Sequence, residues 1–156
     1  MAVPARWIRI ETGQSFARAC EGFALAQTGQ SAPAVLWTRA DRALALAVVA
    51  PLKFAPGHAK RWRAWGLSPL IAAFRHAGLR AYLEEDGIWL SGRRVASGEA
   101  RAVGGCVVVS AEFAPPGARF LDAVRERIES QHGWQFDHGW PSSAEKDAIL
   151  EQANAH

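Results

Sequence analysis

The sequence predicts an α+β fold in which a mostly antiparallel sheet packs against helices. Three observations predict it. Short strand patterns follow one another through tight turns, amphipathic helix patterns lie between groups of strands, and 49% of the 156 residues are apolar. That apolar content is enough to build a substantial core at this length. No linker or internal repeat interrupts the chain, so we expect one domain spanning residues 1–156.

The first third of the chain predicts a strand, a helix and a pair of strands. Residues 7–10 alternate as a short strand does, and residues 15–27 place apolar side chains at helical spacing after Ser15, a typical N-cap. Residues 34–38 and 44–50 have strand patterns that are separated by a turn. The second of these is apolar throughout, as in a buried strand, and a proline ends it.

The remainder predicts a helix, a four-strand meander and C-terminal helices. Ser68 and Pro69 are typical of a helix start, and Gly78 of a helix end. Turn residues then separate the strands, and Ser142 with Glu145 forms a capping-box pattern before the last helix. The expected strands are residues 80–83, 88–90, 93–100 and 106–113, and the expected helices are residues 68–77, 120–128 and 142–152.

The basic residues have one dense cluster, although the formal net charge is only +3. Residues 58–63 read His-Ala-Lys-Arg-Trp-Arg, a mixture that could bind nucleic acid or an acidic partner. An exposed loop or helix start whose side-chain stems pack on tryptophan accounts for the same pattern. We favour that second interpretation, so nucleic acid is not an expected partner.

The sequence also bears on location, metal binding and cysteine chemistry. No apolar run reaches the ~18 residues that cross a membrane, and the N-terminus lacks a signal-peptide pattern, so we expect a cytoplasmic protein without membrane contact. Cys20 and Cys106 lie in apolar surroundings and are expected to be buried thiols. His132, Asp137 and His138 lack metal-ligand spacing, so no metal is expected. Four tryptophans are expected to fill the core or a groove: Trp62, Trp65, Trp134 and Trp140.

The stretch from residue 44 to residue 113 resembles the catalytic domain of the biotin and lipoate protein ligases. It contains an apolar strand ending in proline, a helix, and then Asp-Gly-Ile-Trp-Leu-Ser-Gly-Arg-Arg-Val-Ala-Ser-Gly at residues 86–98. Members of that family carry Asn-Asp-Ile-x-hydrophobic-x-Gly-Arg-Lys-hydrophobic-Ala-Gly at the corresponding place. The resemblance implies the biotin/lipoate ligase fold and, in an active member, ATP and biotin or lipoate as ligands.

The resemblance also implies site residues and partners. Arg94 occupies the position of the lysine that stabilises the negative charge of adenylation, and is the candidate catalytic residue. The candidate ligand-binding residues are Asp86, Gly92, Arg93, Ala96 and Gly98. The implied partner is a biotinyl or lipoyl carrier domain, whose lysine receives the acyl group, or a complementing ligase subunit. An exposed edge strand would also allow a homodimer.

Two departures from the family pattern leave two functions open. Family members carry a Gly- and Arg-rich loop around the adenylate just before the strand that matches residues 44–50, whereas this chain has no glycine between Ser31 and Pro56. Arginine at position 94 is bulkier and forked, unlike lysine. The first hypothesis is a divergent protein that has lost or reduced adenylation and binds an acyl ligand or an acyl-carrier domain. The second is an active ATP-dependent acyl ligase or acyltransferase that attaches biotin, lipoate or a similar acid to a carrier lysine, alone or with a partner subunit.

Overall fold

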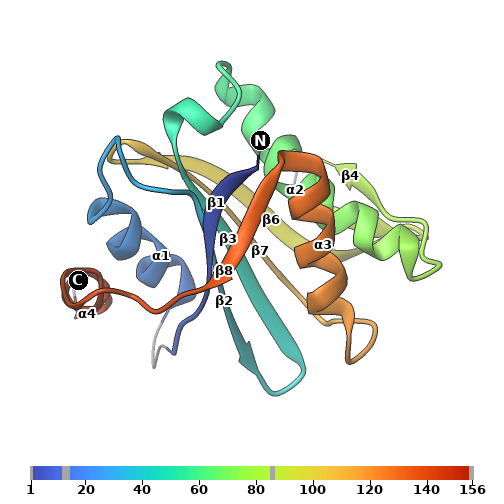
Figure 1. The fold of residues 1–156 in the computed structure, drawn as a ribbon. Coiled ribbons are helices and arrows are strands. Elements are labelled where there is room, and N and C mark those ends of the chain that lie inside the picture. Colours follow the sequence, from blue (N-terminus) through green and yellow to red (C-terminus); the bar gives the residue numbers. More distant parts are fainter. Residues whose placement is uncertain (1, 12–14, 85–86, 155–156) are drawn as a thin grey trace.

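The computed structural model describes residues 2–11, 15–84 and 87–154, which form a mixed sheet between two layers of helices (Figure 1). The strands are β1 (Val3–Arg9), β2 (Ala34–Ala40), β3 (Ala43–Pro51), β4 (Tyr82–Glu84), β5 (Gly87–Leu90), β6 (Arg93–Val103), β7 (Cys106–Phe113) and β8 (Trp134–His138). The α-helices are α1 (Phe16–Leu25), α2 (Trp62–His76), α3 (Phe120–His132) and α4 (Ser143–Asn154), and two 3₁₀ turns, η1 (Leu52–Phe54) and η2 (Ala59–Arg61), join β3 to α2.

The strand order across the sheet is β4-β5-β6-β7-β3-β2-β1-β8. Every neighbouring pair is antiparallel except at one end, where β1 runs parallel to both β2 and β8. The predicted α+β class with a mostly antiparallel sheet is therefore confirmed. Strand β8 was not predicted, because it has only five residues and its partner β1 lies about 130 positions earlier in the sequence.

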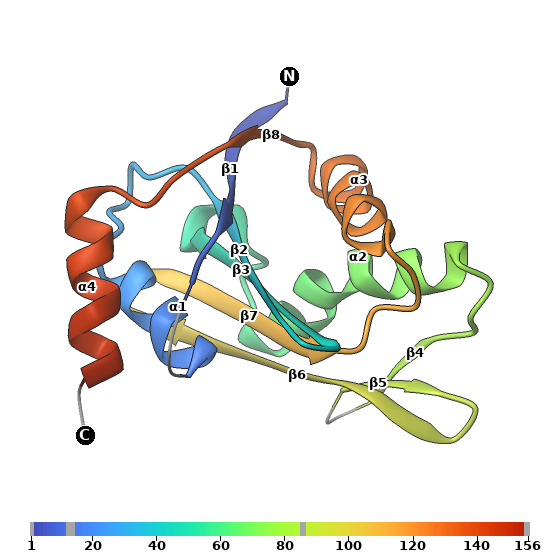
Figure 2. The ribbon, with the colours of Figure 1, turned by 90° about the horizontal axis from the view of Figure 1, so that it is seen from below.

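The two faces of the sheet carry separate apolar clusters. On one face, α2 and α3 cover a cluster that includes Val48 and Val109; on the other, α1 and α4 cover one that includes Ala47 and Val108 (Figure 2). Alternate residues of β3 and β7 thus enter opposite clusters. Burial on both sides explains why residues 44–50 are apolar without interruption.

Helix α2 begins six residues earlier than predicted. Ser68 and Pro69 are not its start: the helix begins at Trp62 and continues through Pro69 to His76. The indole Nε1 of Trp62 donates to the carbonyl oxygen of Pro56 at 2.8 Å and so fastens the preceding segment. Leu67 and Leu70 are almost fully buried on the sheet, and this packing holds the helix together despite its internal proline.

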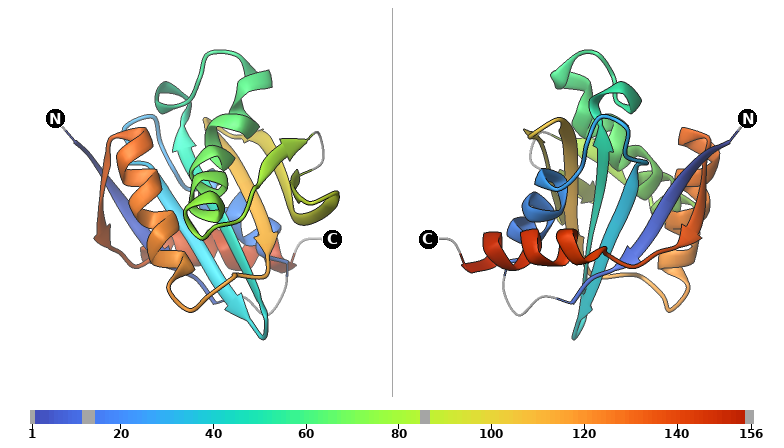
Figure 3. Two further views of the ribbon diagram at one scale, coloured as in Figure 1. Left: turned by 90° about the vertical axis from the view of Figure 1, so that its right-hand side faces the viewer. Right: turned by 60° about the vertical axis from the view of Figure 1, so that its left-hand side comes forward.

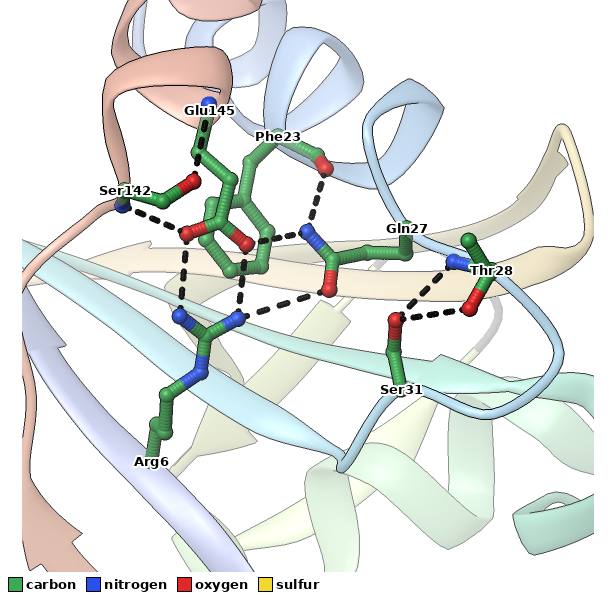
Figure 4. A network of polar contacts seen from close by, with 7 residues as sticks. All are labelled: Arg6, Phe23, Gln27, Thr28, Ser31, Ser142 and Glu145. Carbon is green, nitrogen blue, oxygen red and sulfur yellow. Dashed lines mark hydrogen bonds and ion pairs between the residues drawn. The ribbon is translucent and has the colours of Figure 1, made fainter.

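Helix α4 is attached to the rest of the fold through a polar network (Figure 4). The predicted capping box is confirmed, since the backbone N–H of Ser142 donates to Glu145 and the backbone N–H of Glu145 donates to Ser142 Oγ. The same carboxylate accepts both Nη groups of Arg6 from β1, at 2.9 and 2.7 Å, and Nε2 of Gln27, at 2.6 Å. One buried carboxylate therefore joins three segments that are distant in sequence.

Both cysteines are buried, whereas the tryptophans differ in their exposure. Cys20 and Cys106 are both buried free thiols, and burial raises the pKa of each, so neither is a reactive nucleophile. Trp134 is buried, but Trp140 is 74% exposed and fills neither core nor groove. Within the described ranges, every helix is too short or too polar to span a bilayer.

Candidate functional site

The candidate site is a pocket of about 720 Å³ on the face of the sheet that α1 partly covers. It lies beside the first turn of α1, between the end of the β2–β3 hairpin and the middle of β6 and β7. The first residues of α1, Phe16 and Ala17, line the pocket together with Ser15. Ala43 and Ala45 of β3 line the space, and their small side chains leave it open.

The β6–β7 part of the pocket carries two carboxylates. The strand register places Ser97 opposite Glu112 and Glu99 opposite Ser110, so the two glutamates are diagonal neighbours on one face. Such neighbours have Cα atoms roughly 7–8 Å apart. Glu99 lies 4.0 Å from Arg101, and Arg101 is held more closely by Glu21 at 2.7 Å. This side of the pocket is therefore acidic.

The opposite wall includes two arginines and Glu11. Arg9, at the end of β1, and Arg39, near the end of β2, both line the pocket. The Arg9 guanidinium carbon lies 5.4 Å from the centre of the Trp37 ring, a distance that allows a cation–π contact. Arg9 pairs with Trp37 and Arg39 with Leu44, and these partners pack on the side of the sheet that α2 and α3 cover. The two guanidinium groups are therefore directed away from the pocket, which keeps an apolar middle at β3 and an acidic wall on β6 and β7.

The β2–β3 connection beside this pocket is a tight turn. Ala40 pairs with Ala43, which leaves only Asp41 and Arg42 in the loop, and Asp41 adopts a φ of +49°. By the resemblance of residues 44–113 to the biotin and lipoate ligases, a Gly- and Arg-rich loop is expected just before β3. In this chain a two-residue turn without glycine stands there instead.

The residues predicted from the hairpin motif are only partly near the pocket. Gly92, whose φ is +79°, Arg93 and Arg94 lie at the exposed β5–β6 turn, outside the pocket lining. Ala96 is buried in the cluster beneath α2, opposite Ile88. Gly98 lines the pocket, whereas Asp86 lies outside the described residues.

The residues that sequence reasoning missed are those of the pocket walls. Arg9, Arg39, Glu99 and Glu112 belong to no motif, and strands on opposite sides of β3 contribute them. One signal for them was present. Ser97 and Glu99 alternate with residues of the α2-facing side, and Ser110 and Glu112 do the same on the next strand. Polar residues at the same parity on paired strands indicate a shared polar face.

The histidine-rich segment near residues 132–138 forms an aromatic stack. The His132 ring lies 4.8 Å from that of Trp65 and 4.9 Å from that of Trp134, and burial lowers the His132 pKa to about 4. Asp137 and His138 are exposed on β8. In the described ranges, His, Cys, Asp and Glu nowhere gather in a group of three or more that could hold a metal ion.

This chain resembles known proteins in its structure and not in its sequence. No family model matches the sequence, and no curated protein matches it. Among solved structures, a bi-partite lipoate protein ligase from Thermoplasma acidophilum superposes with a TM-score of 0.79 and 9% identity, over 96% of this chain and 91% of that chain. The chain has the biotin/lipoate ligase fold.

Two further structures agree. Lipoate-protein ligase A bound with ATP gives a TM-score of 0.77 at 11% identity, over 95% of this chain and 93% of that chain. Biotin protein ligase from Aquifex aeolicus gives 0.57 at 10% identity, over 97% and 74%. The resemblance drawn from residues 44–113 is thus confirmed as a likeness of fold that extends over nearly the whole chain.

Proposed function

We propose that the protein is a divergent biotin/lipoate ligase-like protein that binds an acyl ligand in the pocket beside the β2–β3 turn, with adenylation lost or reduced. The observation that carries this proposal is the pocket itself. It persists beside the segment where the family resemblance places the loop around the acyl group and the adenylate, while that segment is reduced to Asp41 and Arg42. The same fold can host different activities, so the ligand is inferred from the residues that line the pocket.

The pocket walls suit an acid with an apolar body. A volume near 720 Å³ is within the usual range for small-molecule sites, and the alanines of β3 offer apolar contact. The first turn of α1 also lines the pocket, and the N-terminal end of a helix favours a carboxylate. Biotin and lipoate both have this combination of apolar body and terminal carboxylate.

The same walls do not fit ATP. A triphosphate requires backbone amides or cations close to its oxygens, and a two-residue turn without glycine provides few such amides. Glu99 and Glu112 would repel a polyphosphate from the other side. This chain on its own is therefore not expected to adenylate an acid.

Filling the pocket should abolish acyl-ligand binding. We expect calorimetric titration to detect biotin or lipoate binding to the natural protein and not to Ala43→Trp, whose indole would occupy the space beside the turn. Ala114→Trp places the same side chain at an exposed position outside the pocket lining and should bind as the natural protein does. Equal binding by both variants, or no binding to the natural protein, would contradict the proposal.

Arg94 remains the predicted anion contact of the hairpin motif. If it reaches a bound adenylate, Arg94→Ala should weaken binding of non-hydrolysable biotinyl- or lipoyl-adenylate analogues at least about tenfold, because a hydrogen bond to a charged group contributes ~1.5–3 kcal/mol. Binding of the free acids should change little. An unchanged affinity for the analogues would leave Arg94 a surface residue.

A second candidate function is supported by one comparison. The Thermoplasma acidophilum ligase is bi-partite, and its structural study includes an E2 lipoyl domain. By analogy, a complementing subunit would supply the missing loop, and this chain would then attach biotin, lipoate or a similar acid to a carrier-domain lysine. Acid-dependent release of pyrophosphate from ATP would support this function if it appeared only with a second subunit. Release by the chain alone would contradict the loss of adenylation.

A further inference from the structure

The charges of the chain are segregated along the sequence. Residues 42–83 contain seven of the 18 Arg and Lys residues and none of the 15 Asp and Glu residues. This quarter of the chain therefore carries +7, while the remainder carries −4. The modest net charge of +3 conceals this difference.

The segment between β3 and the second residue of α2 concentrates these cations on the surface. We call residues 52–63 the basic protrusion; it contains Lys53, Lys60, Arg61 and Arg63. The first three are exposed, and none of the four forms an ion pair with another described residue. Leu52 is 48% exposed, so an apolar side chain lies beside the uncompensated cations.

The basic protrusion is already ordered. The N–H of Leu52 donates to the carbonyl oxygen of Gly105 at 3.1 Å, and the N–H of Ala55 to that of Leu52 at 3.1 Å. The N–H of Arg61 donates to the carbonyl oxygen of His58 at 3.0 Å, and the Trp62 indole closes the segment onto Pro56. Little backbone entropy is lost when such a surface binds a partner.

We propose that the basic protrusion is a docking surface for an acidic protein partner whose surface also presents an apolar side chain. Uncompensated cations steer an oppositely charged surface and select it over neutral ones, and Leu52 offers the apolar contact. Single-stranded nucleic acid fits less well. Its bases need a free aromatic face, whereas the Trp62 indole is half-buried and held by its hydrogen bond to Pro56.

The place of this surface indicates an accessory partner. The basic protrusion follows the C-terminal end of β3, at the opposite end of that strand from the β2–β3 turn (Figure 3). The acyl pocket lies beside that turn. Ala45 of the pocket and Leu52 of the basic protrusion are seven residues apart along this strand, or about 23 Å at roughly 3.3 Å per residue. A partner bound here leaves the pocket open. This inference goes beyond the proposed function and does not depend on it.

Fluorescence anisotropy with two labelled probes tests the proposal. The probes are a 21-residue peptide repeating Glu-Glu-Leu and a 21-nucleotide oligothymidine. We expect the full chain to bind the peptide more tightly than the oligonucleotide, with an affinity that falls as salt rises. Lys60→Glu/Arg61→Glu should weaken peptide binding at least tenfold.

A matched control separates the surface from the net charge. Arg119→Glu/Lys146→Glu makes the same change in charge at exposed positions elsewhere and should weaken peptide binding less than threefold. Leu52→Ser tests the apolar contact and should weaken peptide binding measurably at constant charge. Equal losses in the two double variants, tighter binding of oligothymidine, or no peptide binding by the natural protein would each overturn the proposal.

Discussion

Replacing Glu145 with glutamine is expected to lower the free energy of unfolding at neutral pH by about 3 kcal/mol. The Glu145 side chain is only 8% exposed. Burial raises the pKa of its carboxyl, but hydrogen bonds from Arg6, Gln27 and Ser142 outweigh burial and hold the pKa at about 2, against an ordinary value of 4.5. That difference corresponds to about 3 kcal/mol of stability.

The effect has a defined pH dependence. Because the pKa in the folded state is below that in the unfolded state, the stabilisation is fully present above pH 4.5 and is lost as the pH falls towards 2. The natural protein should therefore lose stability between these pH values, and Glu145→Gln should lose less over the same interval. Urea unfolding at several pH values measures both.

Glu151→Gln is the matched control, because Glu151 is an exposed carboxylate on the same helix. Its expected effect is below about 0.5 kcal/mol. If Glu145→Gln cost as much near pH 2 as at neutral pH, the carboxylate charge would not be the source of the stabilisation. An Arg6→Met variant should lose a similar amount, because it leaves the buried carboxylate without its cation.

Gly66→Ala is expected to destabilise the protein, although alanine favours helices by about 1 kcal/mol over glycine. Gly66 lies where α2 packs on β7, and an added Cβ would come within 2.5–2.7 Å of three side-chain atoms of Val109. Val109 is 1% exposed and has no free space to enter. The helix must move away from the sheet, and we expect a net loss of about 2 kcal/mol or more.

Two comparisons isolate that close contact. Gly29→Ala adds the same atom where nothing lies within 4 Å, so its effect should be small. In a Val109→Ala background, two of the three close contacts disappear, and Gly66→Ala should cost less than in the natural protein. Thermal unfolding measures all four variants. A stabilising Gly66→Ala would show that helix propensity outweighs the packing.

The sequence predicted most of the elements, and where it failed the cause was tertiary. The strand at residues 106–113 is found within its predicted bounds, because its apolar residues are flanked by clear turn signals. The start of α2 was misplaced because Pro69 is usually a helix-start residue, and only its packing on the sheet overrides that preference. Strand β8 needed its distant partner β1 to be recognised.

The candidate site was predicted less completely for a similar reason. The hairpin motif indicated the family resemblance, and Gly98 from that motif lines the pocket. Glu99 and Glu112 become neighbours only through the pairing of β6 with β7, and no local pattern records that pairing.

The sequence by itself determined the class of fold and the resemblance to the biotin and lipoate ligases. It also showed that glycine is absent between Ser31 and Pro56. Periodicity, turn residues and composition are local properties, so the order of residues is enough to determine them. The tertiary structure decided which charges meet. It joined Arg6 to Glu145 across 139 positions, placed Glu99 and Glu112 on one wall of a pocket, and gave the cations of residues 52–63 no ion pair with any residue that the structure describes. Coulomb energy depends on distance in space, which the order of residues along a chain does not specify.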